Sequence, residues 1–256
     1  MKKFRVVMVM VVAPIAAVHA APQPPTVRIL APTLTRSTPG AFGSIWVTEF
    51  AVVNSNTTAT TLEYARSCPS ECSAQISIPA GGYKDITDVL NSASAAPGVF
   101  LYVPTAAAPL MEFSLRVRNL SVQALTFGAE VPVVREDAAF TRPFSLLNVP
   151  IDARFRHLLR IYDFNGQTGT VKVEYLSIPS GSVLVVRMVS VFGESAIGPS
   201  GLSYPAFGSA QQPAEIAGAE RVRIRISPLE STQKLWAFVS FTNNETQEVT
   251  NVSPQQ

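Results

Sequence analysis

Short segments in which apolar and polar residues alternate run through most of this chain of 256 residues. Val222, Ile224 and Ile226 alternate with three arginines, and residues 171–174 alternate in the same way. Turn-forming residues (Pro, Gly, Ser, Thr and Asn) interrupt these segments about every 8 to 12 residues. Because successive side chains of a strand point to opposite faces, the pattern predicts antiparallel sheets with one face in a core and one in water.

Long helical patterns are missing from the sequence. The best candidate, residues 85–91, has room for about two turns, and a parallel sheet would need longer crossover helices. With 47% hydrophobic and 15% charged residues, the chain is also too apolar to be disordered. The sequence therefore predicts an all-β fold.

The two halves of the chain resemble each other at a shift of about 111 to 125 residues. Glu63-Tyr64 recurs as Glu174-Tyr175, and the segment from Leu110 to Asn119 matches the segment from Leu235 to Asn244. The growing shift requires about 14 extra residues in the second copy. We expect them in a longer hairpin or loop at the surface, around Ser177 to Ser203.

The repeat predicts how the chain is divided. We expect a signal peptide at residues 1–20, a first domain at 26–134, a connector at 135–149 and a second domain at 150–256. Each copy has about 105 to 110 residues, which suits two tandem immunoglobulin-like antiparallel β-sandwich domains. A single large barrel or jelly roll is the main structural alternative.

The N-terminus has the composition of an export signal. Lys2, Lys3 and Arg5 precede an apolar run from Val6 to Val18, and small residues allow cleavage after Ala20. The run is shorter than the roughly 20 residues of a spanning helix. We therefore expect a secreted protein, periplasmic or extracellular, with no transmembrane anchor in the mature chain.

Cleavage changes the charge balance, because it leaves 17 basic and 18 acidic residues. Bulk charge then gives no reason to expect nucleic acid as a partner. Most of the remaining basic residues are arginines, whose planar fork suits phosphate, sulfate or carboxylate. They cluster at Arg135, Arg142, Arg154, Arg156 and Arg160, and at a candidate anionic-ligand patch formed by Arg221, Arg223 and Arg225. The alternative for this patch is a solvated strand face whose arginines pair with glutamates.

Cys68 and Cys72 are the only cysteines. An oxidising destination favours a disulfide between them. With three residues between the cysteines, the bond would mainly stiffen a loop.

Candidate catalytic residues are few. His157 is the one histidine after cleavage, it lies in a predicted strand, and the chain has no Gly-x-Ser-x-Gly motif. A Ser-His-Asp hydrolase and a zinc or copper site are therefore not expected. A two-carboxylate glycosidase stays open, because it needs only two acids at a suitable separation.

Three elements resemble uncharacterised secreted bacterial proteins with tandem β-sandwich (Ig-like) repeats. They are Arg135 to Phe140, the segment from Phe155 to Tyr162, and Ile78-Pro79-Ala80-Gly81-Gly82. The resemblance covers most of the mature chain and implies the same fold, but it carries no catalytic residues.

These patterns favour a non-enzymatic, secreted or cell-surface structural or interaction protein without cofactors. Its partner would be a protein or a glycan, bound through loops or a sheet edge. Two alternatives remain: a carbohydrate-active enzyme that uses paired carboxylates, and a periplasmic chaperone-like protein that pairs an edge strand with its client.

Overall fold

The structure is a computed structural model, and it confirms the all-β class. It describes residues 25–33, 35, 37–66, 72–87, 98–122, 127–193, 196–197, 202–203, 206–216 and 219–254. Within these residues every strand pairing is antiparallel, and the helices that lie wholly within them are short 3-10 turns. The predicted signal peptide lies outside the described residues and stays a prediction.

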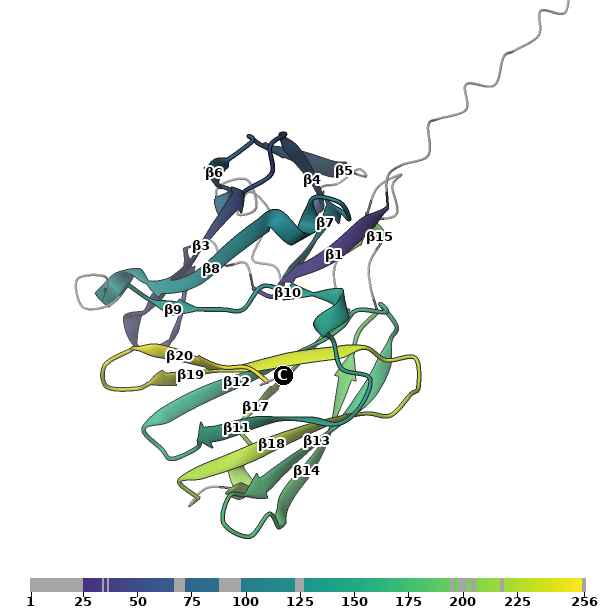
Figure 1. Ribbon diagram of the computed structural model, residues 1–256. Coiled ribbons are helices and arrows are strands. Elements are labelled where there is room, and N and C mark those ends of the chain that lie inside the picture. The colour runs from purple at the N-terminus through teal and green to yellow at the C-terminus, as the bar shows by residue number, and fades with distance from the viewer. Residues whose placement is uncertain are drawn as a thin grey trace, which may run out of the picture.

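The first β-sandwich consists of two sheets (Figure 1). One has the order β10-β1-β7-β4-β5, with strands Val134–Arg135, Thr26–Ala31, Val99–Pro104, Thr60–Arg66 and Cys72–Ile78. The other has the order β2-β3-β8-β9, with strands Thr38–Pro39, Ile45–Asn54, Met111–Asn119 and Ala129–Glu130, and β6 (Gly82–Asp85) also pairs with β3.

The second β-sandwich repeats this arrangement. One sheet has the order β11-β18-β13-β14, with strands Phe144–Pro150, Arg221–Pro228, Gly169–Ser177 and Val183–Val191. The other has the order β17-β12-β19-β20, with strands Ala206–Gln211, Phe155–Asp163, Leu235–Asn243 and Val249–Val252. Each strand of this sandwich thus has a counterpart in the first, in the same chain order and the same sheet position.

The register of the repeat differs from the sequence comparison by one residue. Asn54 and Asp163 end equivalent strands, and the Oδ1 atom of each accepts a hydrogen bond from the N–H two residues later, at 3.0 and 2.9 Å. They pair with Met111 and Leu235, so Leu235 corresponds to Met111 and not to Leu110. The difference matters because a one-residue shift exchanges the core and solvent faces of a strand.

The second sandwich begins inside the segment that we expected to be a connector. Residues 144–150 form β11, which pairs with β18 at the edge of the sheet. Before it, β10 pairs with β1 of the first sandwich, and a 3-10 turn at Glu136–Ala138 follows. Strand pairing leaves only the residues around Phe140 to link the two sandwiches.

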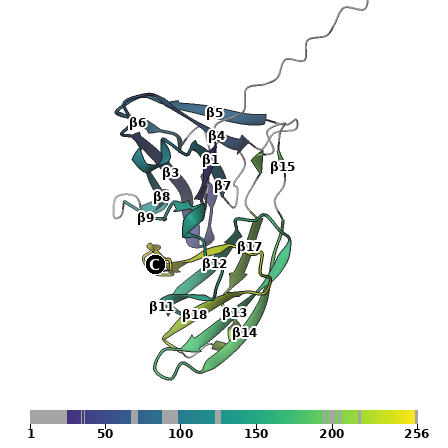
Figure 2. The same cartoon turned by 45° about the vertical axis from the view of Figure 1, so that its right-hand side comes forward.

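The extra residues of the second copy lie between β14 and β17. They include a small hairpin of β15 (Ala196–Ile197) and β16 (Leu202–Ser203), absent from the first copy. This hairpin lies against β4 and β7 of the first sandwich (Figure 2). The sequence predicted a longer hairpin or loop in this part of the second copy, and contacts of β16 with β4 and β7 show that the hairpin bridges the two sandwiches.

Part of one sheet of the second sandwich is buried on both faces. Leu159, Ile161 and Ala237 of this sheet face the core of their own sandwich. On the opposite face, Tyr162 and Trp236 pack into the hydrophobic cluster of the first sandwich, together with Phe238 and Phe164. Since inter-domain interfaces of this hydrophobic kind resist relative motion, the two sandwiches form one packed unit.

Hydrogen bonds and ring contacts complete the junction. The Tyr162 hydroxyl donates to the carbonyl oxygen of Pro32. The rings of Phe100 and Phe164 are 5.3 Å apart. At the other end, the side-chain amide of Asn251 donates to the carbonyl of Glu130 at 2.9 Å.

Candidate functional site

The arginines of the predicted patch lie in a row on β18. The Arg225 Nε atom is 2.7 Å from Glu174 Oε2, and Arg221 donates to Asn148 at 3.0 Å. A hydrogen bond from the Arg225 guanidinium, and to a smaller extent one from Lys172, holds the pKa of Glu174 below its usual range. Part of the positive charge of this face is therefore compensated, and none of its three arginines lines the cleft between the sandwiches.

The predicted disulfide cannot be placed on the structure. Cys68 lies outside the described residues, and of Cys72 only the backbone is described, as the first residue of β5. The disulfide stays a prediction.

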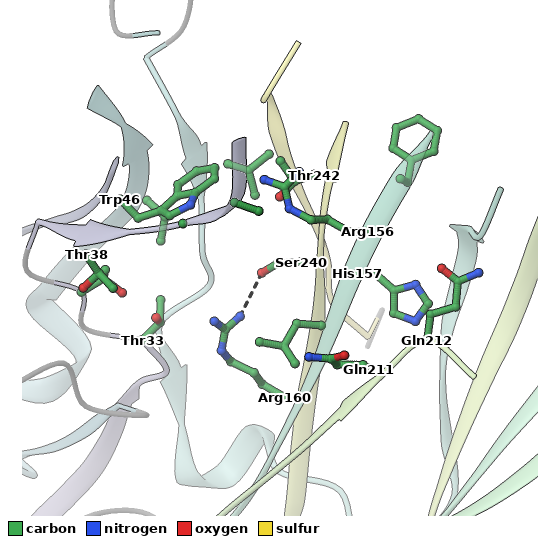
Figure 3. Close-up of a pocket in the computed structure, with 17 residues that line it drawn as sticks. Thr33, Thr38, Trp46, Arg156, His157, Arg160, Gln211, Gln212, Ser240 and Thr242 are labelled. Atoms are coloured by element: carbon green, nitrogen blue, oxygen red, sulfur yellow. Dashed lines mark hydrogen bonds between the residues drawn. The ribbon is translucent and has the colours of Figure 1, made fainter. Parts of the chain in front are cut away.

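A cleft of about 720 Å³ opens between the two sandwiches where the hydrophobic junction ends (Figure 3). Its lining from the first sandwich comprises Thr33, Thr35, Thr38, Gly40, Ala41, Trp46 and Val117. Its lining from the second comprises Phe155, Arg156, His157, Leu158, Arg160, Gln211, Gln212, Ser240, Thr242 and Val249. None of these described lining residues is acidic. Hydroxyl, amide and guanidinium groups dominate its polar lining.

A tight loop from Gly40 to Ser44 forms the wall of the first sandwich. A Cβ atom on Gly40 would lie 2.4 Å from Trp46 Nε1, so glycine lets the indole pack against this backbone. Phe42 has a φ of +56°, a conformation that costs a bulky residue energy, and its ring is 71% exposed. The loop thus holds Trp46 in the cleft and displays Phe42 at the rim.

Alternation along β12 supplies the opposite wall. Arg156, Leu158 and Arg160 point out of the second sandwich, and they pair with Thr242, Ser240 and Phe238 of β19. Figure 3 shows Arg156, Arg160 and Ser240 facing Trp46 and Thr38 across the cleft.

Arg156 is held by neutral partners. Its two terminal nitrogens donate to Asn244 Oδ1 and Gln247 Oε1, both at 2.8 Å. Its guanidinium carbon lies 5.3 Å from the centre of the Phe42 ring, so the contact joins the two sandwiches. Burial lowers the pKa of Arg156, but a guanidinium stays charged at neutral pH.

Arg160 lies deeper in the cleft. Its guanidinium carbon is 5.5 Å from the centre of the Phe238 ring, and Nη1 donates to Ser240 Oγ at 3.3 Å. Ser240 in turn donates to Asn251 Oδ1 at 2.8 Å. Burial lowers the pKa of Arg160. Among the described residues, no carboxylate lies within ion-pair distance of Arg156 or Arg160.

His157 lies in β12, as predicted, but its imidazole faces away from the cleft. The residue pairs with Phe241 in the row that faces the core of the second sandwich, and Figure 3 shows the ring pointing away from Arg160. Within the described residues, neither ring nitrogen has a hydrogen-bond partner, nor has the hydroxyl of Tyr175, whose ring is 6.4 Å away. Burial lowers the pKa of His157 to about 4, so this imidazole is neutral at pH 7.

The sequence predicted only part of this cleft. Arg156 and Arg160 belong to the arginine cluster that composition had singled out, whereas Arg135 and Arg154 of that cluster pair with Asp137 and Asp152 on the surface. Trp46 and the threonines of the first sandwich were missed, because only the packing of the two sandwiches brings them to the arginines.

Other kinds of site receive no support from the described residues. They contain no group of three metal-ligating side chains, and no helix long and apolar enough to span a membrane. Comparison with known proteins found no family model that matches the chain, and no match among curated proteins.

Proposed function

We propose that the chain is a secreted, non-enzymatic binding protein that holds a glycan in the cleft between its two sandwiches. The observation that carries this proposal is the lining of the cleft. Hydroxyls and side-chain amides offer donors and acceptors for sugar hydroxyls, and Trp46 offers an aromatic face for the apolar side of a sugar ring. The position and volume of the cleft also match ligand sites, which lie preferentially at domain interfaces.

The test is calorimetric titration of the purified, exported protein with a panel of neutral and acidic oligosaccharides. At least one of them should bind, and Trp46→Ala should weaken that binding about tenfold or more, since loss of an aromatic anchor is costly. Tyr83→Ala is the matched control, because Tyr83 is 64% exposed on the first sandwich and outside the cleft. Equal losses in both variants, or no binding by any saccharide, would refute the proposal.

The enzymatic alternative predicts a different result with the same panel. A two-carboxylate glycosidase needs acids on both sides of the scissile bond, and no described residue that lines the cleft is acidic. We expect the saccharides to be recovered intact after incubation. Release of shorter products, abolished by one Asp or Glu substitution, would favour the enzyme.

A second candidate function rests on β14. This strand ends its sheet, runs for nine residues, and exposes Leu184, Val186 and Met188 at 42, 45 and 58%. A long apolar edge is a template for pairing with a strand of another protein, as in chaperone-like complexes. Val186→Lys should abolish capture of an extended client peptide and leave saccharide binding unchanged.

The immunoglobulin-like assignment is also part of the proposal. Immunoglobulin constant domains place their first two strands in one sheet. Here the first long strands of each copy, β1 and β3 or β11 and β12, lie in opposite sheets. We therefore group the chain with immunoglobulin-like surface modules by sandwich architecture and not by strand order.

A further inference from the structure

Building on the proposed function, we infer that the glycan is acidic, and that Arg160 binds its carboxylate or sulfate group. The inference rests on the proposed function, because it names the class of saccharide that the same cleft takes. It starts from a contrast among the arginines of the chain.

Arginines outside the cleft are mostly neutralised by the protein itself. Six of them in the described residues pair with a carboxylate: Arg28, Arg118, Arg135, Arg154, Arg187 and Arg225. Arg156 and Arg160 have only neutral hydrogen-bond partners. Arg221 and Arg223 also have no carboxylate partner among the described residues, but they lie on the solvent-facing side of β18. The cleft is therefore where two uncompensated positive charges are partly buried.

Arg160 has fewer partners than Arg156. Burial lowers its pKa, and its one hydrogen bond within the described residues leaves most of its five N–H donors unused. Leaving a buried charge uncompensated is strongly unfavourable. Phe238 and Ser240 nevertheless fix the guanidinium at the cleft, where Figure 3 shows it pointing toward the first sandwich. An anion with two oxygens that accept parallel N–H bonds, such as a carboxylate or a sulfate, would satisfy the group.

Arg156 has a supporting role. Its hydrogen bonds to Asn244 and Gln247 and its contact with Phe42 hold it in place, so its charge adds to the potential of the cleft without being the primary contact. Both charges are screened less than surface charges, because they are partly withdrawn from water.

The remaining lining selects a sugar over other anions. Threonine hydroxyls and glutamine amides surround the arginines and can hydrogen-bond to sugar hydroxyls, while apolar side chains such as Val117, Leu158 and Val249 can contact the apolar faces of the sugar rings. A volume of about 720 Å³ fits a short oligosaccharide, because small-molecule sites span roughly 300 to 1,000 Å³. The indole of Trp46 in this lining offers a stacking surface for a sugar.

The test compares trigalacturonate with its methyl ester, which has the same sugars without the charge. The exported protein should bind the acid at least tenfold more tightly, and the preference should shrink as salt rises. A second arm compares a sulfated dextran oligosaccharide with unsulfated dextran, which distinguishes sulfate from carboxylate as the bound group.

Arg160→Gln removes the charge but keeps a donor for Ser240. We expect it to weaken binding of the acid about tenfold or more and to leave binding of the ester within twofold. Arg223→Gln, on the exposed face of β18, is the matched control and should change neither. If Arg160→Gln does not fold, Arg156→Gln replaces it, with a smaller expected loss.

The outcomes separate the two proposals. Equal affinity for acid and ester, or an unchanged Arg160→Gln variant, would overturn the acidic ligand and leave glycan binding intact. No binding of any saccharide would overturn the proposed function and this inference with it. Displacement of trigalacturonate by an equal concentration of a poly-glutamate peptide would show that the cleft recognises charge alone. That result would refute the proposal that its ligand is a saccharide.

Discussion

Acid should destabilise this protein through one buried histidine. His157 is 6% exposed, and burial lowers its pKa from 6.5 to about 4. The unfolded chain therefore binds a proton at pH values where the folded chain does not. Between pH 6.5 and about 4 the unfolded state gains protons first, so the free energy of unfolding falls as the pH is lowered.

The size of the effect follows from the shift in pKa. Each pKa unit corresponds to about 1.4 kcal/mol, so the loss amounts to about 3 kcal/mol once the pH is below the folded pKa. That is a large part of the roughly 5 to 15 kcal/mol that stabilises a typical domain. Above pH 6.5 the contribution of His157 is constant.

The assay compares denaturant unfolding of wild type and His157→Phe from pH 7 to pH 4. Phenylalanine keeps a ring beside Tyr175 but cannot take up a proton. As the pH falls from 7 to 4, the free energy of unfolding of wild type should drop by about 3 kcal/mol relative to that of the variant. The contributions of other titrating groups cancel in this difference. In the chain cleaved after Ala20, a proton NMR titration of the one remaining histidine gives its folded pKa directly. A difference in free energy of unfolding between the two proteins that does not change with pH, or a titration midpoint of His157 near 6.5 in the folded protein, would refute the reasoning.

Three further predictions concern the junction, a buried acid and the sheet edge. Tyr162→Phe leaves the Pro32 carbonyl unpaired and should lower the free energy of unfolding by about 1 to 3 kcal/mol; a loss below 0.5 kcal/mol would contradict the interface contact. Burial raises the pKa of Asp163, whose Oδ2 has no partner among the described residues. Ionised Asp163 therefore lowers the free energy of unfolding at pH values above its pKa. Asp163→Asn places the equivalent residue of the first sandwich, Asn54, at this position, and in denaturant unfolding it should change the free energy of unfolding more favourably at pH 7 than at pH 4. The reverse order would be inconsistent with the raised pKa. Val186→Lys should reduce concentration-dependent light scattering, because a charge blunts an exposed edge strand; unchanged scattering would count against edge pairing.

The fold was predictable because the period of a strand is visible in single residues. The alternation of Val222, Ile224 and Ile226 with arginines sets the two faces of β18, and these three residues are buried as expected. The repeat likewise indicated two similar halves. Its register was wrong by one residue, because turn residues and short apolar runs match almost equally well at neighbouring shifts.

The cleft was harder to predict, because it is made by packing between segments far apart in the sequence. One signal was nevertheless present. Residues 235–239 form an unbroken apolar run on β19, and such runs are typical of strands buried on both faces. The neighbouring β12 has Ile161 and Tyr162 in succession, which fits the same pattern. Read together, these runs point to a sheet covered by the other sandwich, and therefore to the cleft beside it.

The two tryptophans of the chain provide the most direct test of ligand binding between the sandwiches. Trp46 lines the cleft, whereas Trp236 is 4% exposed in the hydrophobic junction and acts as an internal control. The two indole N–H signals are recorded by NMR during titration with trigalacturonate and assigned with Trp46→Phe. The Trp46 signal should shift and saturate while the Trp236 signal stays in place. A titration in which the ligand binds and the Trp46 signal does not move would contradict the cleft as the binding site.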